Sequence, residues 1–361
     1  MAFTADELEN ITNATLDYYM GRGTVYANAI QNKPMMKAFD AFAKQELPGG
    51  KGNVSLAVKT GKGGGSLSGY THDDTVTYYN PTGIKRVNFG WKEHHIGMGL
   101  THTELKHDGI TVLERGASQR TAEKDSREET MLANLLQDKV EVMNEDYAVS
   151  WDSLLHGDGT GDTKAIAGVQ AFILDDPALG STGGLARTNT WWRNRAATTA
   201  ADTAGSGVAP ITSNTAGGGA LLQFLQTEER QLNRFAQGSR RSRMFAGSDF
   251  IDAVEKELRA NGQYAQTGWK GGDGNVDGAM PVVRWNGITI EYDPTMDDLG
   301  LNKRMYNIDM RNLFLVYMKG EKMKKANPAR PHDKYVMYRA VTTTAVMATR
   351  QLNTSGVYDI A

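Results

Sequence analysis

The most regular pattern in the chain is an apolar stripe with helical spacing near its middle. Its positions recur at intervals of three and four residues: Leu132, Leu136, Val140, Met143, Tyr147, Trp151 and Leu154. Such spacing places them on one face of a helix, and at ~1.5 Å per residue the stripe spans roughly 33 Å. The remaining positions are acidic, with nine acids and five bases from Glu114 to Asp146. We predict a long amphipathic helix over 114–155, ended by HGDGTGD (156–162).

The segments that precede this helix alternate between apolar and polar positions. They are rich in β-branched and aromatic residues, which is typical of strands. The expected strands cover residues 54–60, 75–79, 84–91 and 92–102. A glycine-rich stretch, GKGGGSLSGYTHDD, separates the first two. The pattern predicts a long β-hairpin or meander with a mobile end, which cannot bury both faces by itself and needs a neighbour.

The rest of the chain mixes both periodicities. Helices are expected over 5–20 with Thr4 as the cap, over 35–45 before Pro48, over 220–238, and after Asp249, which would cap the last of them. Strands are expected over 243–248, over 280–294 as a hairpin turning at Asn286–Gly287, over 312–319, and over 335–351 as one long strand. Residues 197–219 read as an exposed loop. The order predicts an α+β protein: arm, β-excursion, long helix, mixed body and final strand.

Composition excludes several classes of protein. With 361 residues the chain suits two or three subdomains. Its net charge of −2 does not indicate a nucleic-acid binder. It has no cysteine, which rules out disulfides, thiolate metal sites and a cysteine nucleophile. No stretch approaches the roughly 20 apolar residues of a membrane span, and the acidic start does not resemble a signal peptide. We expect a protein made and used in a cytoplasm.

No catalytic constellation emerges from the motifs. GKGGGS (61–66) has its lysine before the glycines, unlike a Walker loop. The loop at Asp158 lacks a glutamate at its twelfth position, where Val169 stands, so it does not fit an EF-type calcium site. There is no Gly-x-Ser-x-Gly elbow. We therefore expect no enzyme activity and no catalytic, cofactor-binding or metal-binding residues.

Histidines and basic residues are unevenly distributed. Five of the seven histidines are His72, His94, His95, His102 and His107. We interpret them as surface or inter-subunit residues, with a pH-sensitive contact as the alternative. Residues 301–361 hold eleven Lys and Arg against four Asp and Glu, and a second basic cluster runs from Arg234 to Arg243. These clusters are either a solvated face or a surface for an acidic partner, which is nucleic acid or the acidic helix of a neighbouring copy.

The stretch GGLARTNTWWRN (183–194) places two tryptophans between arginines. We interpret Trp191 and Trp192 as an anchor at a junction, with Arg187 and Arg193 on wet polar rims near subunit contacts. Core packing within one subunit explains the tryptophans equally well.

Three segments in this order resemble the major capsid proteins of tailed double-stranded DNA bacteriophages, which have the Hong Kong 97 fold. They are LLHGDGTGDTKAIAGVQAFI (154–173), GGLARTNTWWRN (183–194) and RMFAGSDFIDAVEKEL (243–258). The resemblance covers essentially the whole chain and implies four parts. These are an N-arm (1–50), an extended β-loop lying over the adjacent subunit (51–113), a peripheral domain with a spine helix (114–169 and 331–361) and an axial domain (170–330).

The resemblance also implies a function. Copies of the chain would self-assemble through hexamers and pentamers into an icosahedral head that encloses double-stranded DNA, assembled in a host bacterial cytoplasm and located in the virion. Implied partners are the chain itself, DNA held non-specifically, a scaffold, a portal and decoration proteins, and no membrane. The candidate inter-subunit contacts are Lys59, Lys62, Tyr70, Arg86, Trp91, Arg187, Trp191, Trp192 and Arg193. The candidates to face DNA or another acidic partner are Arg240, Arg241, Lys322, Lys324 and Lys325.

The chain departs from the family in two respects, and these limit which family properties we expect of it. The chain starts without a long acidic helical prefix, so we expect a separate scaffold protein or none. Some relatives crosslink a loop lysine to a neighbour's asparagine; Lys59, Lys62 and Asn353 have the residue types, but we expect no crosslinking. The alternatives are an encapsulin-like compartment shell, and a soluble enzyme with an unrecognised site.

Overall fold

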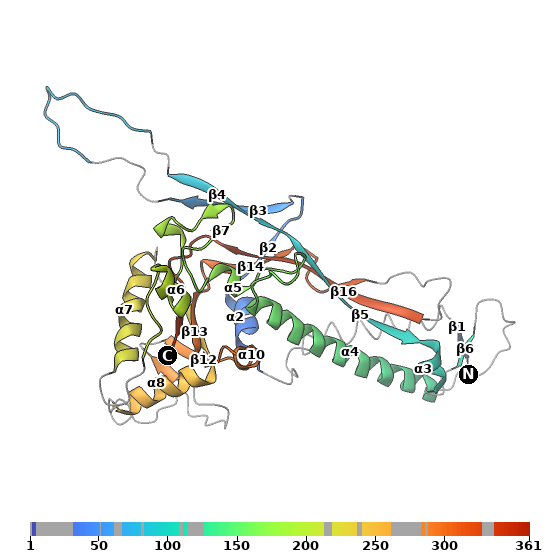
Figure 1. The fold of residues 1–361 in the computed structure, drawn as a ribbon. Coiled ribbons are helices and arrows are strands. Elements are labelled where there is room, and N and C mark those ends of the chain that lie inside the picture. Colours follow the sequence, from blue (N-terminus) through green and yellow to red (C-terminus); the bar gives the residue numbers. More distant parts are fainter. Residues whose placement is uncertain are drawn as a thin grey trace. The chain divides into compact units, whose positions relative to one another are not determined.

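The structure is a computed structural model of the chain. It describes residues 2–4, 32–50, 52–60, 67–80, 83–107, 111–113, 126–212, 219–236, 240–260, 283–285, 288–326 and 336–361. They form two compact units, which are drawn in Figure 1. Unit 1 comprises the described parts of 1–32, 93–153 and 318–344, and unit 2 those of 33–92, 154–317 and 345–361.

Unit 2 is built on a mixed six-stranded sheet. Its strands lie in the order β11 (Val283–Trp285), β12 (Ile288–Tyr292), β10 (Ser242–Ala246), β13 (Arg304–Asp309), β17 (Gly356–Asp359) and β9 (Arg195–Ala197). β10 runs parallel to β12 and antiparallel to β13. β11 and β12 form the predicted hairpin, with Trp285 opposite Ile288; its turn residues lie outside the described part.

Two amphipathic helices pack against this sheet. α7 (Ala220–Arg234) contributes Leu221 and Leu225 to the core, and α8 (Ser248–Ala260) contributes Phe250 and Val254. Both helices were expected from their spacing, but α8 begins at Ser248, so Asp249 lies in its first turn instead of capping it.

The N-terminus of α7 is capped from α8. Its N-cap is Gly219, which has no side chain to accept a hydrogen bond. Both carboxylate oxygens of the buried Glu257 accept instead, from the backbone N–H groups of Leu221 and Leu222 at 3.1 Å each. A carboxylate there also interacts favourably with the helix dipole, so one side chain fixes the two helices to each other.

Short elements complete unit 2. They are α2 (Pro34–Phe42), β2 (Lys44–Leu47), α5 (Val169–Phe172), β7 (Ser181–Thr182), β8 (Leu185–Ala186), the 3₁₀ helix η2 (Thr190–Trp192), α6 (Thr199–Ala204) and α10 (Pro294–Asp298). α2 ends earlier than predicted, because residues 44–47 pair with β14 (Leu313–Met318). α6 lies in the expected loop 197–219; Thr198 caps it and Gly205 ends it at φ +66°.

The extended hairpin belongs to unit 2. β3 (Asn53–Lys59) and β4 (Ile84–Gly90) pair antiparallel over their full length, from Asn53 opposite Gly90 to Lys59 opposite Ile84. Residues 75–79, expected as a strand, form none: they are exposed along their whole length. Among the described residues no strand lies beside them to complete the hydrogen bonds of a ladder.

Unit 1 holds most of the long helix. α4 (Ser126–His156) carries the predicted stripe, and the side chains described on it are buried at Val140, Met143, Tyr147 and Trp151. They pack on β5 (Lys92–Thr101) and on the first part of β16 (Val336–Thr349), where Val341 joins Val140 and Met143 in one cluster. The Tyr147 hydroxyl lies 3.0 Å from the Thr343 hydroxyl.

Smaller elements surround these strands in unit 1. β15 (Lys324–Ala326) pairs antiparallel with β16, and β1 (Ala2–Thr4) pairs parallel with β6 (Thr111–Leu113). α3 (His102–His107) follows β5 directly. The last residues of β16 lie in unit 2, where Ala345 to Thr349 pair with Tyr317 to Leu313 of β14. The long final strand is therefore confirmed; the helix expected after Thr4 lies outside the described residues.

In the first capsid-like segment (154–173), the position of Gly168 requires a residue without a side chain. It precedes α5, and a Cβ there would meet the carbonyl oxygens of Leu155, Leu154 and Gly157 at 2.3, 2.4 and 2.6 Å. These are backbone atoms in the turn that ends α4, so they cannot swing aside as a flexible side chain would.

We expect Gly168→Ala to lower the free energy of unfolding by about 3 kcal/mol, because the added methyl overpacks backbone atoms. Gly161→Ala in the same loop is the control, since a Cβ there meets nothing within 4 Å. Urea unfolding of both variants tests this, and equal midpoints would contradict it.

Candidate assembly surfaces

The base of the extended hairpin is fixed to the body of unit 2. One face of its strands is buried through Val54, Val87 and Phe89. Gly183, at φ +60°, accepts a hydrogen bond from the Asn88 N–H at 3.2 Å. A Cβ on Gly183 would lie 2.9 Å from Val87 Cβ and 3.0 Å from Phe89 Cζ, so the close approach of this turn requires glycine. The strand pair therefore leaves the body at a defined point.

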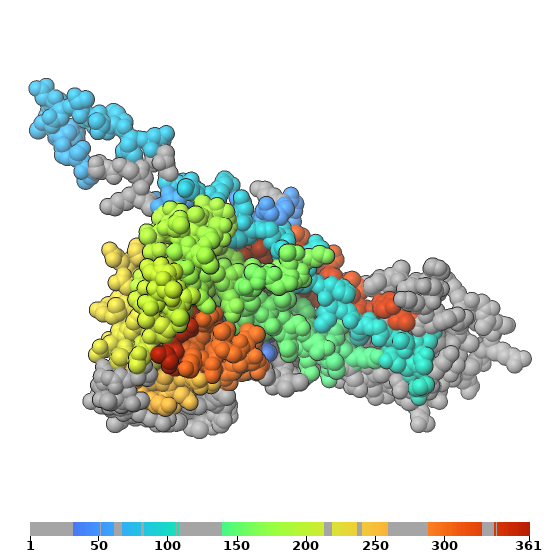
Figure 2. Space-filling view, viewed as in Figure 1, coloured from blue at the N-terminus to red at the C-terminus, as the bar shows by residue number. Residues whose placement is uncertain are grey.

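Beyond the base, the loop exposes apolar side chains. Every residue from 67 to 80 is exposed, including Tyr70 (74%), Tyr78 (94%) and Tyr79 (61%). Figure 2 shows this segment as a cord of atoms that no other coloured part of unit 2 covers. Single exposed apolar residues are ordinary, but several along one extended segment mark a binding surface. Tyrosine is enriched at interfaces because an apolar ring and a polar hydroxyl suit a partly wet contact.

The arginine–tryptophan segment forms a buried hub. Arg187 is fully buried: Nε donates to Thr182 Oγ1 at 2.7 Å, Nη1 to Asn194 Oδ1 at 2.8 Å, and Nη2 to the Phe172 carbonyl. Trp192 is also fully buried, and its indole N–H donates to the Thr182 carbonyl at 3.1 Å.

No carboxylate within the described part of the chain forms an ion pair with Arg187. Burial lowers the pKa of its guanidinium to about 10, because the charged form loses its hydration. The hydrogen bonds to neutral oxygens therefore offset the desolvation of the charge.

This geometry corrects two of the predicted contacts. Arg187 does not lie on a wet rim, because its polar atoms are satisfied inside its own chain. Trp192 is fully buried as well, so for this residue the core-packing alternative holds. Trp191 and Arg193 are half-buried, and the two indole rings lie 5.9 Å apart. These two side chains are the part of the hub that reaches the surface of unit 2.

The other predicted contact residues belong to the hairpin. Lys59, Tyr70 and Arg86 are exposed and Trp91 is half-buried. Lys62 lies outside the described residues. No observation on the chain alone tests whether they touch another subunit, so these residues stay predictions.

Arg240 is a further correction, since it does not face outward. Its side chain is 2% exposed and donates to Glu229 Oε1 at 2.7 Å and to Asn307 Oδ1 at 2.9 Å. An arginine bound to a buried carboxylate is not available to nucleic acid. Arg241, Lys324 and Lys325 are exposed and Lys322 is half-buried, so these four stay candidates.

The histidines divide into two groups. His72, His95 and His107 are exposed. His102, the first residue of α3, is buried. His94 is half-buried and packs edge-on against Trp151, with ring centroids 5.3 Å apart. The surface interpretation is therefore wrong for His102, whereas for the half-buried His94 it stays a prediction.

Sequence reasoning missed a buried polar pair in unit 2. His156, in the last turn of α4, lies 2.9 Å from Asp293 through Nε2 and Oδ2, and both are buried. Asp293 also caps α10 by accepting from the Thr295 N–H at 3.1 Å. The cap before Pro294 was visible in the sequence, but its partner 137 residues away was not.

The chain matches known proteins in its fold but not in its sequence. No family model matches the sequence, and no curated protein matches it. Solved structures do match. The capsid asymmetric unit of cyanophage A-1(L) has a TM-score of 0.58 at 14% identity, covering 92% of this chain and 94% of that chain. The capsid of the native GTA particle has a TM-score of 0.51 at 14% identity and 92% coverage of both chains.

A third match is the capsid of the Myoviridae phage XM1, with a TM-score of 0.51 at 13% identity, covering 91% of this chain and 92% of that chain. The chain therefore has the fold of phage capsid proteins, and the predicted Hong Kong 97 architecture is confirmed. Within the described ranges, no helix combines the length and apolar character needed to cross a membrane.

Proposed function

We propose that the chain is a major capsid protein, the structural subunit of a bacteriophage head. The capsid fold over nine-tenths of the chain supports this role. The observation that carries it is the extended hairpin, whose base is fixed by Gly183 while residues 67–80 expose tyrosines that nothing in unit 2 covers. Such a segment gains stability only when another molecule buries it.

We further propose how the copies assemble and what they enclose. Copies form hexamers and pentamers, which close into an icosahedral head around double-stranded DNA in the virion. Symmetry makes the same surfaces serve every copy, so one exposed hairpin per chain gives each subunit of a ring the same contact with its neighbour. Arg241, Lys324 and Lys325 are exposed cations suited to non-specific contact with phosphates. A scaffold, a portal and decoration proteins are the further partners of such a head.

Expression of the full chain tests this function. We expect light scattering to report particles far larger than a dimer, and negative-stain electron microscopy to show shells, tubes or capsomer rings. DNA inside particles from infected cells would separate a phage head from a compartment that holds protein cargo. A chain that stays a monomer or dimer at every concentration would contradict the proposal.

A further inference from the structure

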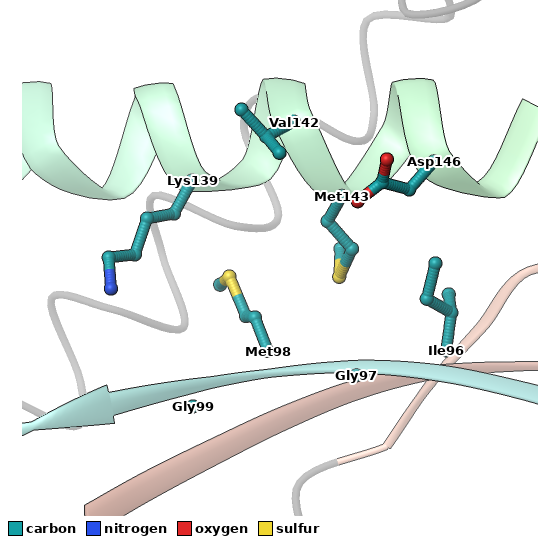
Figure 3. A pocket seen from close by; sticks show the side chains of 8 residues that line it. All are labelled: Ile96, Gly97, Met98, Gly99, Lys139, Val142, Met143 and Asp146. Atoms are coloured by element: carbon teal, nitrogen blue, oxygen red, sulfur yellow. The ribbon is translucent and has the colours of Figure 1, made fainter.

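Four exposed arginines of unit 2 form a surface of one charge sign, unlike the groove of unit 1. That groove, between α4 and β5, is lined by one cation and one anion, Lys139 and Asp146 (Figure 3). In unit 2, one arginine ends α7, one precedes β10, one follows β13 and one follows β16: Arg234, Arg241, Arg311 and Arg350. We name these four residues the arginine cluster.

Hydrogen bonds of the backbone hold three of the four positions together. One carboxylate oxygen of Asp309 accepts from the N–H groups of Arg241 and Arg311, at 3.2 and 3.1 Å. The Arg350 N–H donates to the carbonyl of Asn312, the residue after Arg311, at 3.0 Å. Asp309 is buried, so the carboxylate between these positions is internal while the arginine side chains are exposed.

Aromatic rings position two of the guanidinium groups. The Arg350 guanidinium lies over the Phe314 ring, 5.0 Å from its centroid, and that of Arg234 lies over Phe235 at 5.6 Å. A guanidinium held over a ring keeps its N–H donors in its own plane, where they can reach a further partner. The Gln351 side chain donates to the Phe235 carbonyl at 2.8 Å, which joins the end of α7 to the segment after β16.

Acidic residues do not neutralise this surface. On α7, β10, β13 and β16 the acids are Glu228, Glu229 and Asp309, and all three are buried. Arg230, one turn before Arg234 on α7, adds a further exposed cation. The exposed charge on these four elements is therefore entirely positive.

Polar side chains, not apolar ones, accompany the cluster. Asn233 is exposed, and Asn312 and Gln351 are half-buried. Among the described residues on these elements and directly beside them, Phe235 is the one large apolar side chain that is exposed. Protein–protein interfaces have an apolar core, whereas protein–DNA interfaces are more polar and much more positively charged. The composition of the surface favours DNA over a protein as its partner.

We propose that the arginine cluster binds the phosphate backbone of double-stranded DNA without reading its sequence. A guanidinium pairs with phosphate oxygens through two parallel N–H donors, and phosphate contacts carry no sequence information. The inference rests on the proposed function, since it assigns one surface of unit 2 to the DNA that the head encloses. It also explains how a chain with a net charge of −2 can bind a polyanion.

Binding of a short fluorescent DNA duplex to the purified full chain tests the proposal. The variant replaces all four arginines of the cluster by glutamine, and fluorescence anisotropy is measured at several salt concentrations. We expect at least about ten-fold weaker binding at low salt, and a slope of log Kd against log salt that falls by about 3, because each phosphate contact contributes about 0.9. Both effects should be the same for duplexes of different sequence.

A control variant removes the same charge elsewhere in unit 2. It replaces four exposed lysines by glutamine: Lys59, Lys85, Lys256 and Lys303. Two of them lie on the extended hairpin, one on α8 and one at the opposite end of β13 from the cluster. We expect the salt slope of this variant to change by less than about 1, because net charge alone makes no phosphate contact.

Further variants keep the test valid if the four-fold glutamine variant unfolds at a lower temperature than the parent chain. Arg234→Gln and Arg241→Gln, made singly, should each lower the salt slope by about 1. Replacing all four arginines by lysine retains the charge, so this variant should keep the slope of the parent chain to within about 1.

Equal salt slopes for the glutamine variant of the cluster and the lysine-to-glutamine control would overturn the proposal. So would polyglutamate that displaces the duplex as well as unlabelled DNA of equal charge does, because the cluster would then suit an acidic protein. Negative-stain microscopy separates this inference from the proposed function. Normal shells from a cluster variant that binds DNA as the parent chain does would contradict the inference alone, whereas DNA binding through the cluster by a chain that never assembles would contradict the proposed function alone.

Discussion

Replacing Arg187 by methionine is expected to lower the free energy of unfolding by about 3 kcal/mol. The guanidinium is fully buried and donates to Thr182, Asn194 and the Phe172 carbonyl. Methionine fills most of the volume but donates no hydrogen bond. Asn194 Oδ1 still accepts from the Leu174 N–H, so the Thr182 hydroxyl and the Phe172 carbonyl lose their donor, at about 1–3 kcal/mol for each group that water cannot reach. The change is measured as the urea midpoint of the full chain.

Two further variants identify the cause of this loss. Arg187→Lys keeps the charge but not the planar fork, so we expect it to recover less than half of the lost stability. Arg193→Met is the control, since Arg193 is half-buried beside the same tryptophans, and it should shift the midpoint little. Equal midpoints for the Arg187 and Arg193 variants would show that the buried hydrogen bonds of Arg187 contribute no more to stability than the half-buried side chain of Arg193 does.

Replacing Tyr70, Tyr78 and Tyr79 together by serine is expected to abolish assembly while leaving the folded chain intact. All three are more than half exposed, so their removal costs the isolated chain little. At an interface each buried tyrosine contributes about 2 kcal/mol, and every subunit contact of a shell would lose the three together. Light scattering and negative-stain microscopy measure assembly, and thermal unfolding confirms the fold.

Leu299→Ser is the matched control for this experiment. Leu299 is 44% exposed in unit 2 but lies after α10, far along the chain from the loop. We expect it to assemble as the parent chain does. Shells of normal size and yield from the triple serine variant would show that the loop tyrosines are not needed for assembly.

Local patterns were sufficient for the long elements. The stripe from Val140 to Trp151 predicted α4 because helix spacing depends only on neighbours three and four residues apart. The apolar run before Met318 predicted β14, and the long alternation after Val336 predicted β16. α6 could also have been found, since Thr198 and Gly205 are ordinary helix-boundary residues.

Strand β13 was missed because its polar residues disguise a buried strand. Asn307 and Asp309 are each 1% exposed, although asparagine and aspartate are more typical of turns than of buried strands. Their partners lie far along the chain: Asn307 donates to Glu229 at 3.1 Å, and Asp309 accepts from the Arg241 N–H at 3.2 Å. The opposite error occurred at residues 75–79, which have strand-like composition but no adjacent strand in the described structure.

The sequence by itself determined the order of arm, extended hairpin, long helix, mixed body and final strand, because each follows from spacing and composition within a few residues. Only the tertiary structure decided which polar side chains are internal. Arg187, Arg240 and Asp293 look like surface residues in the sequence, yet each is held by partners brought close by the fold. Whether a charge is buried depends on atoms distant in sequence, and no local pattern records them.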